Sequence, residues 1–341
     1  MELESRKVQK LGYSSLGVSL PKAWAESNGI LPGSVVNLSI EDDGTLRVRV
    51  GPFEEYPTAA EATIDADDWT GAETLTRLIT GDYIVGCNTI KVRSRDELSP
   101  AQLQEIHEAV RGLTGLTIVN QGPRFVTIEN FVEPTRFPID GLLRRLHYLT
   151  SRMEVEVDRL YWLVVRQLLL AAQNRTVAAK IGVTEPRHLL GNRVASVTLE
   201  NIGDLWEELA TEIGPLLRSG RPPSREFAKT VAGLKARLEK IIELTMTSFF
   251  ASDLEKANEA LDLQLALVRD LHQLAVSVGN DHREPKRASS SNALGLVLRP
   301  MEHVSKYYAT IAQVTINRVL ETPLRPRPAG REAAAPIEAA E

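Results

Sequence analysis

Two different periodicities divide the chain. Up to about residue 131, apolar and polar positions alternate over short runs, a pattern typical of strands that bury one face. From about Ile139 the alternation stops, and apolar positions recur every three or four residues, as at Leu142, Leu146 and Met153. The pattern predicts a mixed N-terminal part of strands and helices, followed by an all-helical C-terminal part.

The first 51 residues predict four short strands and one helix. Two strands fall within residues 6–20, and a helix opens at Pro21 and stops at Asn28-Gly29. An Asp43-Gly44 turn joins the last two strands as a hairpin. So few elements bury too little apolar surface to be stable alone, so we expect residues 1–51 to dimerise.

Three short stretches of this segment carry a family resemblance. Residues 6–10 read Arg-Lys-Val-Gln-Lys, residues 18–24 read Val-Ser-Leu-Pro-Lys-Ala-Trp, and residues 33–36 read Gly-Ser-Val-Val. In these stretches the segment resembles the AbrB/SpoVT family of DNA-binding domains. The resemblance implies that two chains exchange hairpins to form one swapped-hairpin β-barrel that binds double-stranded DNA.

The charges of the segment favour the same function. Residues 5–22 hold no acid and four basic side chains: Arg6, Lys7, Lys10 and Lys22. A dimer doubles these charges, which can contact phosphates with release of counterions. Arg47 and Arg49 point to one face of the last strand, and we expect them to extend the site. The alternative is a charged edge in a module that only dimerises, because residues 1–50 hold six basic and six acidic side chains.

Residues 52–135 predict a small α/β connector domain. We expect strands at 62–66, 89–93, 116–120 and 125–129, one helix from about residue 72 to residue 80 or 85, and one helix capped by Ser99-Pro100. Cys87 stands in an apolar context, so we expect a buried structural thiol. His107 stands alone on a helix of mixed charge, which favours a surface or packing role.

Breakers at Gly182–Pro186, Gly214-Pro215, 219–223 and 279–292 divide the helical part into two consecutive units, 136–219 and 220–322. We expect helices at about 186–217, 225–250, 252–278 and 292–321. No Gly or Pro occurs between Gly141 and Gly182, which predicts one long helix after Gly141 and leaves open whether the first unit closes within one chain or borrows a helix. The Pro- and Ala-rich residues 323–341 are expected to be disordered.

Carboxylates spaced four residues apart form the candidate metal site. Glu154 and Asp158 share one helical face, and Glu200 and Asp204 share another. If the two helices are antiparallel neighbours, the four carboxylates converge into a cage of hard oxygen ligands. Such a cage favours magnesium, manganese or iron over zinc. The alternative is a pair of solvated acidic faces.

The run 156–168, followed by Glu-Asn-Ile-Gly-Asp at 200–204, resembles the PhoU family of helical phosphate-signalling regulators. The resemblance implies metal roles for Glu154, Asp158, Glu200 and Asp204. Archaeal PhoU-like regulators also have an N-terminal module and a connector, so the resemblance to them covers nearly the whole chain.

In the second helical unit Lys306 replaces the family's second carboxylate beside Glu302, so that unit's metal site is expected to be vestigial. We expect His272 and His303 to be packed or surface histidines.

Composition limits the remaining options. The formal net charge of −5 excludes a broadly basic nucleic-acid protein, so any DNA site must be local. No apolar run is long enough to span a bilayer, and the first residues lack the apolar core of a signal peptide. The single cysteine allows no intrachain disulfide. We therefore expect a cytoplasmic protein.

Together these observations predict a multidomain α+β protein: a swapped-hairpin β-barrel dimer, an α/β connector and all-α PhoU-like bundles. The leading hypothesis is a homodimeric DNA-binding transcription regulator linked to phosphate uptake and homeostasis. The alternative is a signalling adaptor that binds a phosphate transporter or sensor kinase and uses its N-terminal module only to dimerise. No nucleophile–base constellation or Gly-rich phosphate loop is present, so we expect no enzymatic activity.

Overall fold

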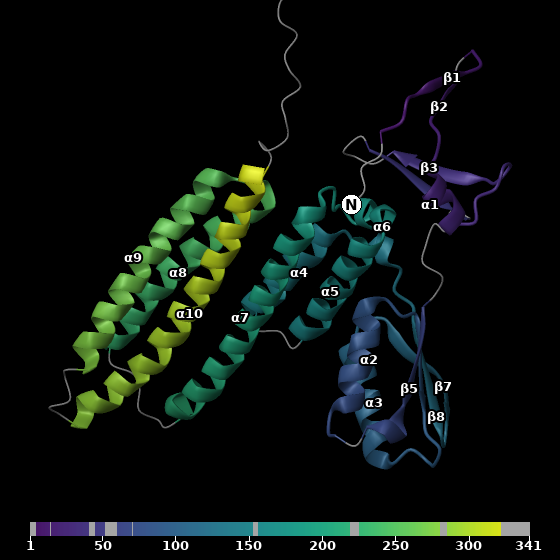
Figure 1. Cartoon of the computed structure of the whole chain (residues 1–341). Coiled ribbons are helices and arrows are strands. Elements are labelled where there is room, and N and C mark those ends of the chain that lie inside the picture. The colour runs from purple at the N-terminus through teal and green to yellow at the C-terminus, as the bar shows by residue number, and fades with distance from the viewer. Residues whose placement is uncertain are drawn as a thin grey trace, which may run out of the picture. The chain divides into compact units, whose positions relative to one another are not determined.

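The structure, a computed structural model, describes residues 5–13, 15–40, 45–51, 60–69, 71–152, 156–218, 225–279 and 285–321. It separates into two compact units, Met1–Thr58 and Ala59–Glu341 (Figure 1). The finer domain boundaries expected at 51, 135 and 219 stay predictions, and the tail at 323–341 lies outside the described residues. The chain is multidomain, with a small β N-terminal region and a largely helical C-terminal part.

The first unit contains two antiparallel hairpins and a short helix, in the order expected from the sequence. Its elements are β1 (Gln9–Leu11), β2 (Ser15–Gly17), α1 (Lys22–Ser27), β3 (Val36–Ile40) and β4 (Leu46–Val50). β1 pairs with β2, and β3 pairs with β4, as two separate sheets. Among the residues of this unit that the structure describes, none is buried. One copy of the unit therefore has no core of its own.

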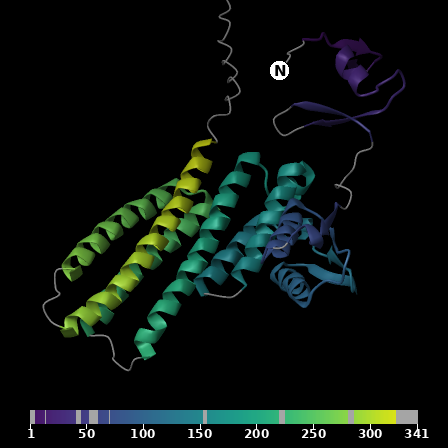
Figure 2. The ribbon, with the colours of Figure 1, turned by 60° about the horizontal axis from the view of Figure 1, so that its bottom comes forward.

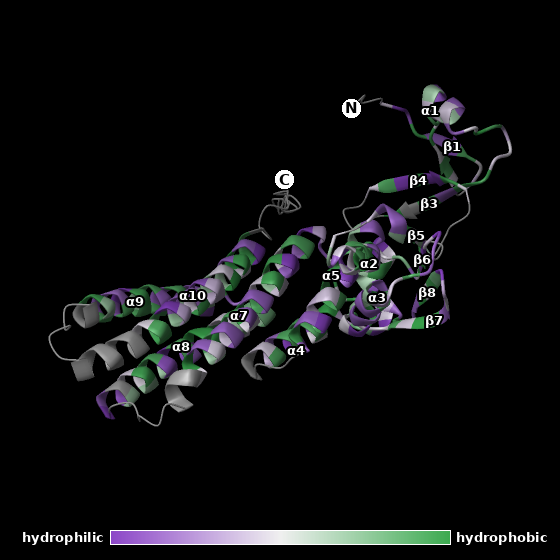
Figure 3. Cartoon of the chain, turned by 90° about the horizontal axis from the view of Figure 1, so that it is seen from below, coloured by the Kyte–Doolittle hydropathy of each residue, from purple (hydrophilic) through white to green (hydrophobic). Residues whose placement is uncertain are grey.

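The β3–β4 hairpin has one apolar face and one polar face. The register pairs apolar residues on one side: Val36 with Val50, Leu38 with Val48, and Ile40 with Leu46. On the other side Asn37 pairs with Arg49, and Ser39 with Arg47. Figure 3 shows the same alternation of apolar and polar positions along β4. Apolar side chains on the first face stay exposed, with Ile40 at 83% and Leu38 at 60%.

The second unit begins with a four-stranded sheet that two helices cover on one face. The elements are β5 (Glu61–Asp65), η1 (Ala66–Asp68), α2 (Thr74–Val85), β6 (Thr89–Arg93), α3 (Pro100–Gly112), β7 (Leu116–Gly122), β8 (Phe125–Asn130) and η2 (Pro134–Arg136). The strand order is β5-β6-β8-β7, with β5 and β6 parallel and the other neighbours antiparallel. Ser99 caps α3 as the sequence predicts, and in the structure it forms a capping box with Gln102. This arrangement confirms the expected strands and helices of the connector.

Long helices form the rest of the second unit: α4 (Ile139–Arg152), α5 (Val157–Gln173), α6 (Arg175–Lys180), α7 (Pro186–Arg218), α8 (Arg225–Ala251), α9 (Leu254–Gly279) and α10 (Pro285–Glu321). Helices α4, α5 and α7 contact one another, as do α8, α9 and α10, and α7 also packs on α10 (Figure 2). One apolar core runs through both sets, from Leu143 and Ile202 to Ile241 and Ile311. None of the described helices is long and apolar enough to cross a membrane.

The expectation of one continuous helix after Ile139 is wrong. α4 ends at Arg152, α5 begins at Val157, and the two helices pack against each other. The intervening sequence, residues 153–156, holds one β-branched valine and two glutamates, one of them four residues before Asp158. A β-branched residue and like charges at that spacing weaken a helix without Gly or Pro. Folding back buries Leu143 and Leu146 of α4 with Val164 of α5 in one core. The first set of helices therefore closes within a single chain.

Candidate nucleic-acid interface and carboxylate cluster

The cations expected to bind DNA all lie on the surface of the first unit. All six are exposed: Arg6, Lys7, Lys10, Lys22, Arg47 and Arg49. The structure brings Arg47 and Arg49 together on the polar face of β4, opposite the exposed apolar face. Lys22 opens α1, where its Nζ lies 3.7 Å from Oε1 of Glu26.

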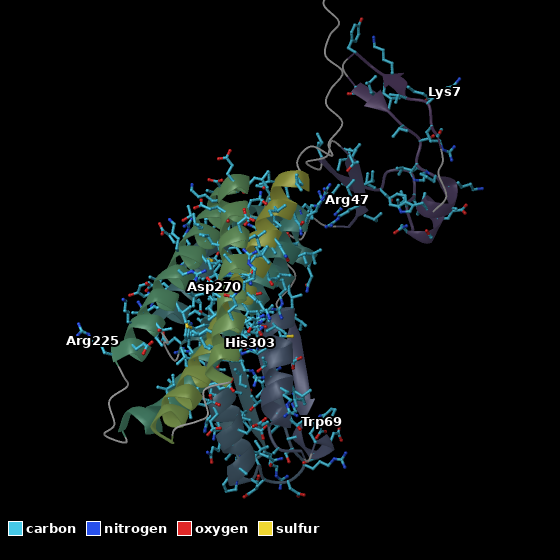
Figure 4. The ribbon with its side chains drawn as sticks, turned by 90° about the vertical axis from the view of Figure 1, so that its left-hand side faces the viewer. Lys7, Arg47, Trp69, Arg225, Asp270 and His303 are labelled. Atoms are coloured by element: carbon cyan, nitrogen blue, oxygen red, sulfur yellow. The ribbon has the colours of Figure 1, made fainter. Side chains whose placement is uncertain are left out.

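The remaining cations lie on other segments of the unit. Lys10 is in β1, and Arg6 and Lys7 precede that strand. Figure 4 shows Lys7 and Arg47 on different hairpin segments. Since the two hairpins form separate sheets, one chain does not present the six cations on a common sheet.

Three of the four predicted metal ligands converge between α5 and α7. Asp158, Glu200 and Asp204 each offer a carboxylate oxygen, and these oxygens all lie within 4.8 Å of one another. Asp158 stands in the first turn of α5, and Glu200 and Asp204 stand one turn apart on α7. Glu154, the fourth predicted ligand, lies outside the described residues.

Close helix packing places these carboxylates. A Cβ atom at Gly203 would lie 3.3 Å from Cγ1 of Val157, so the small residue lets the first turn of α5 approach α7 beside Asp204. One turn away, Thr150 of α4 donates a hydrogen bond to the carbonyl oxygen of Leu199, at 3.2 Å. Both contacts hold the helices at the level of Glu200.

The cluster is electrostatically strained as three carboxylates. Burial, followed by the charges of Asp204 and Asp158, raises the pKa of Glu200 to about 7, against a smaller opposing effect of Arg193. Burial and the charges of Asp204 and Glu207 also raise the pKa of Asp158. The pKa of Asp204 is raised by burial and by Glu207. A bound cation would relieve this repulsion, because it favours the ionised form of each ligand.

More acids continue along α7 from the cluster. Asp204, Glu207, Glu208 and Glu212 line, with Thr211, a hollow of about 480 Å³. Carboxylate oxygens alone suit hard cations such as Mg²⁺, Mn²⁺ or iron, which bind such sets with water in the remaining positions. The residues present therefore fit the expected class of metal.

The corresponding region of the second helical set is neutralised by cations. Lys306 Nζ lies 2.5 Å from Oε1 of Glu302, and Nε2 of His272 lies 3.2 Å from the same oxygen. The hydrogen bond from Lys306, assisted by His272, lowers the pKa of Glu302. Lys306 therefore compensates the charge of Glu302. Figure 4 places His303 on α10 in this set.

Two other expectations concern residues in the α/β layer. Cys87 is buried, and burial raises the pKa of its thiol, in agreement with a structural cysteine. His107 is on the surface side of α3, where Nε2 lies 3.1 Å from Oε1 of Gln121. Cys87 is thus a buried packing residue, and His107 makes a surface contact.

A buried arginine in α5 was not predicted from the sequence. Arg166 is 2% exposed and reaches the end of α2, far away in sequence. The visible signal was a charged residue inside the apolar run from Leu160 to Ala172, which marks a buried cation that needs partners.

Comparison with known proteins identifies one part of the chain. Residues 9–52 match the family described as antidote-toxin recognition MazE, bacterial antitoxin. The N-terminal region is therefore a domain of the MazE/AbrB type, which is consistent with DNA-binding regulation or with antitoxin function. No curated protein matches the chain. No solved structure matches it either.

Proposed function

We propose that this protein is a homodimeric, DNA-binding transcription regulator whose helical part holds a metal ion. The observation that carries the proposal is the exposed apolar face of the β3–β4 hairpin, inside a domain of the MazE/AbrB type. Domains of this type commonly dimerise and bind DNA. The proposal describes a regulator and not an enzyme.

The dimer follows from the burial of the first unit. Six apolar side chains share one face of β3–β4, and no described residue of the unit is buried. Fully burying one such side chain contributes roughly 1.5–3 kcal/mol. A second copy, with exchanged hairpins as the AbrB/SpoVT resemblance implies, would cover this face and form a closed barrel.

The proposal of DNA binding rests on the basic side chains that would stay exposed on the dimer. If the apolar face is buried in the barrel, the opposite face with Arg47 and Arg49 stays in water. Arg6, Lys7, Lys10 and Lys22 add exposed charge in each copy. Pairing two copies doubles these cations on one surface and supplies the phosphate contacts that dominate affinity for DNA.

The carboxylate cluster is the proposed sensing part. Asp158, Glu200 and Asp204, with Glu154 as the fourth ligand from sequence, would hold Mg²⁺, Mn²⁺ or iron. A bound cation would tie the start of α5 to α7 and so stabilise the first set of helices. The link to phosphate homeostasis rests on the resemblance of residues 156–168 and 200–204 to the PhoU family.

The family match favours a second candidate, an antitoxin that binds DNA and also a toxin protein. The adaptor hypothesis, in which the first unit only dimerises and the helices bind a transporter or sensor kinase, is the third. The antitoxin would bind a toxin protein, and the adaptor would bind a transporter or sensor kinase. Identifying the bound partner therefore distinguishes these two functions from the regulator.

Selection from a library of random duplexes with the full-length protein tests the proposal. We expect enrichment of a sequence with two-fold symmetry, because a dimer reads two half-sites. The double variant Arg47→Ala/Arg49→Ala should enrich little, and Arg77→Ala, whose guanidinium pairs with Glu73 in the second unit, should select as wild type does. Absence of enrichment by the wild type would favour the adaptor.

A further inference from the structure

Among the residues that the structure describes, no helix covers one face of the four-stranded sheet of the second unit. Buried side chains such as Ile90, Val92 and Val126 all point to the side of α2 and α3. The alternate positions, including Lys91, Arg93 and Thr127, point to the opposite side. That side is the open face, and its residues are half-buried or exposed.

A hollow of about 370 Å³ lies where β6 and β8 meet on this face. Its lining includes three basic side chains, Lys91, Arg93 and Arg124, and contains no acid. The register places Arg93 opposite Phe125 and Lys91 opposite Thr127. The volume falls in the range typical of small-ligand sites.

The three cations differ in how they are neutralised. Lys91 pairs with Glu61, at 2.5 Å between Nζ and Oε1. Across the part of the chain that the structure describes, the guanidinium groups of Arg93 and Arg124 form neither a side-chain hydrogen bond nor an ion pair. Asp65 is the neighbour of Arg93 in register, but its Oδ1 accepts from the backbone N–H of Asp67, at 3.1 Å, and no ion pair with Arg93 forms.

Two uncompensated guanidinium groups at one hollow form a receptor for an anion. Each offers a planar fork that matches the oxygens of phosphate and can bind them in a bidentate manner. Ser94, which also lines the hollow, does not compete for the arginines because its hydroxyl donates to Asp67, at 2.7 Å. An anionic ligand could therefore bind both arginines at little cost in broken contacts.

Phe125 adds an aromatic surface to the same hollow. It lies opposite Gly122 in register, and a Cβ atom at Gly122 would lie 2.5 Å from Cε1 of the ring. The missing side chain therefore lets the ring lie down over β7, while 38% of Phe125 stays exposed. An aromatic ring that packs on β7, is partly exposed and lies beside two arginines suits stacking by a planar base.

We propose that this hollow binds a mononucleotide, with its phosphate held by Arg93 and Arg124 and its base stacked on Phe125. The site lies in the second unit and does not depend on DNA binding by the first. It would give the protein a small-molecule effector in addition to the metal ion.

Isothermal titration calorimetry of the full-length protein with the four ribonucleoside monophosphates tests this site. At least one of the four should bind. Its nucleoside, which lacks the phosphate, and ribose 5-phosphate, which lacks the base, should each bind about tenfold more weakly or worse. Arg93→Lys and Arg124→Lys, which keep the charge but lose the fork, should each weaken binding about tenfold.

Two further variants separate the roles of the base and the phosphate. Phe125→Leu should weaken the nucleotide but leave ribose 5-phosphate unchanged, because only the base uses the ring. Arg77→Ala is the matched control, since its guanidinium is paired with Glu73 on α2, and it should bind as wild type does. Failure of all four nucleotides at millimolar concentration, or binding by both lysine variants as tight as that of the wild type, would overturn the proposal. Capture of oligonucleotides but not mononucleotides through the same arginines would overturn it as well.

Discussion

Arg166 of α5 donates a hydrogen bond to the carbonyl oxygen of Cys87, just beyond the end of α2, at 3.1 Å. The same guanidinium also bonds to the carbonyl oxygens of Tyr83 and Gly86 and to Oδ1 of Asn88. These carbonyls lie at the C-terminal end of α2, where the Tyr83 carbonyl also accepts from the backbone N–H of Gly86, at 3.2 Å. A cation suits this negative end of the helix dipole. One buried side chain thus joins the α/β layer to the long helices.

Replacing this arginine should loosen the joint. Arg166→Met keeps much of the apolar volume but leaves several buried carbonyls unpaired, so we expect the free energy of unfolding to fall by roughly 3–5 kcal/mol. Arg166→Lys should recover only part of the stability, because an ammonium cannot reach the same set of acceptors. Urea denaturation measures both effects, with Arg77→Ala as the exposed control. A decrease below about 1 kcal/mol for the methionine variant would show that the network is not stabilising.

The carboxylate cluster should respond in opposite ways with and without metal. Glu200→Gln removes one of three repelling charges, so the metal-free protein should melt at a higher temperature than wild type. With Mn²⁺ the wild type should gain stability and the variant should not. Glu302→Gln is the matched control, because Glu302 already pairs with Lys306, and it should keep the gain. Thermal melts with and without Mn²⁺ measure this; an equal gain in wild type and Glu200→Gln would contradict the metal site.

The raised pKa of Glu200, about 7, also fixes the sign of the pH dependence. Because the folded pKa exceeds the unfolded value, the contribution of Glu200 to the stability of the metal-free protein falls as pH rises from about 4.5 to 7, and then levels off. Metal binding needs the ionised carboxylate, so affinity for Mn²⁺ should rise over the same window and release a proton below pH 7. Titrations between pH 5.5 and 8 measure this. Affinity that is independent of pH would mean that Glu200 is not a ligand.

His147 should make the contact between the two helical sets sensitive to acid. Its ring meets Tyr308 of α10 edge-on, with 6.1 Å between ring centroids, and burial lowers its pKa to about 4. The unfolded chain takes up this proton near pH 6.5, so stability falls as pH falls from 6.5 towards 4, by roughly 2–3 kcal/mol. His147→Gln should remove that part of the acid sensitivity, measured as the difference between the two denaturation curves at pH 7 and pH 4.5. Parallel decreases in both proteins would contradict a buried neutral imidazole.

The apolar face of β3–β4 should decide the oligomeric state. Ile40→Lys places a charge on the face that the dimer is proposed to bury, so we expect monomers at low micromolar concentration. Asn37→Lys places the same charge on the polar face of the same strand and should leave the dimer intact. Sedimentation velocity of the full-length variants distinguishes the two results. Wild-type monomers, or dimers of Ile40→Lys, would contradict the proposed interface.

Local sequence signals predicted much of the fold. Ser99 caps the start of α3 as expected, and β6 has the predicted bounds. The end of α4 at Arg152 could not be predicted, because no Gly or Pro marks it. What separates α4 from α5 is their packing against each other, which buries Leu146. Spacing predicted that Glu200 and Asp204 share one helical face, but that Asp158 joins them depends on the packing of α5 against α7, which spacing does not give. The partners of Arg166 are about 80 residues away in sequence and leave no local signal. Arg93 and Arg124 line one hollow only because β6 pairs with β8.

The central claim is that the first unit binds DNA, and the salt dependence of binding tests it most directly. Fluorescence anisotropy of a duplex enriched by the wild type would give log K against log salt concentration for wild type, Arg47→Ala/Arg49→Ala and Arg77→Ala. If the two arginines bind phosphates, removing each arginine–phosphate interaction should flatten the slope by about 0.9, and the effect doubles in a dimer. We expect Arg77→Ala to keep the wild-type slope and the double variant to have a shallower one. A wild-type slope near zero, or the same slope in all three proteins, would contradict the claim.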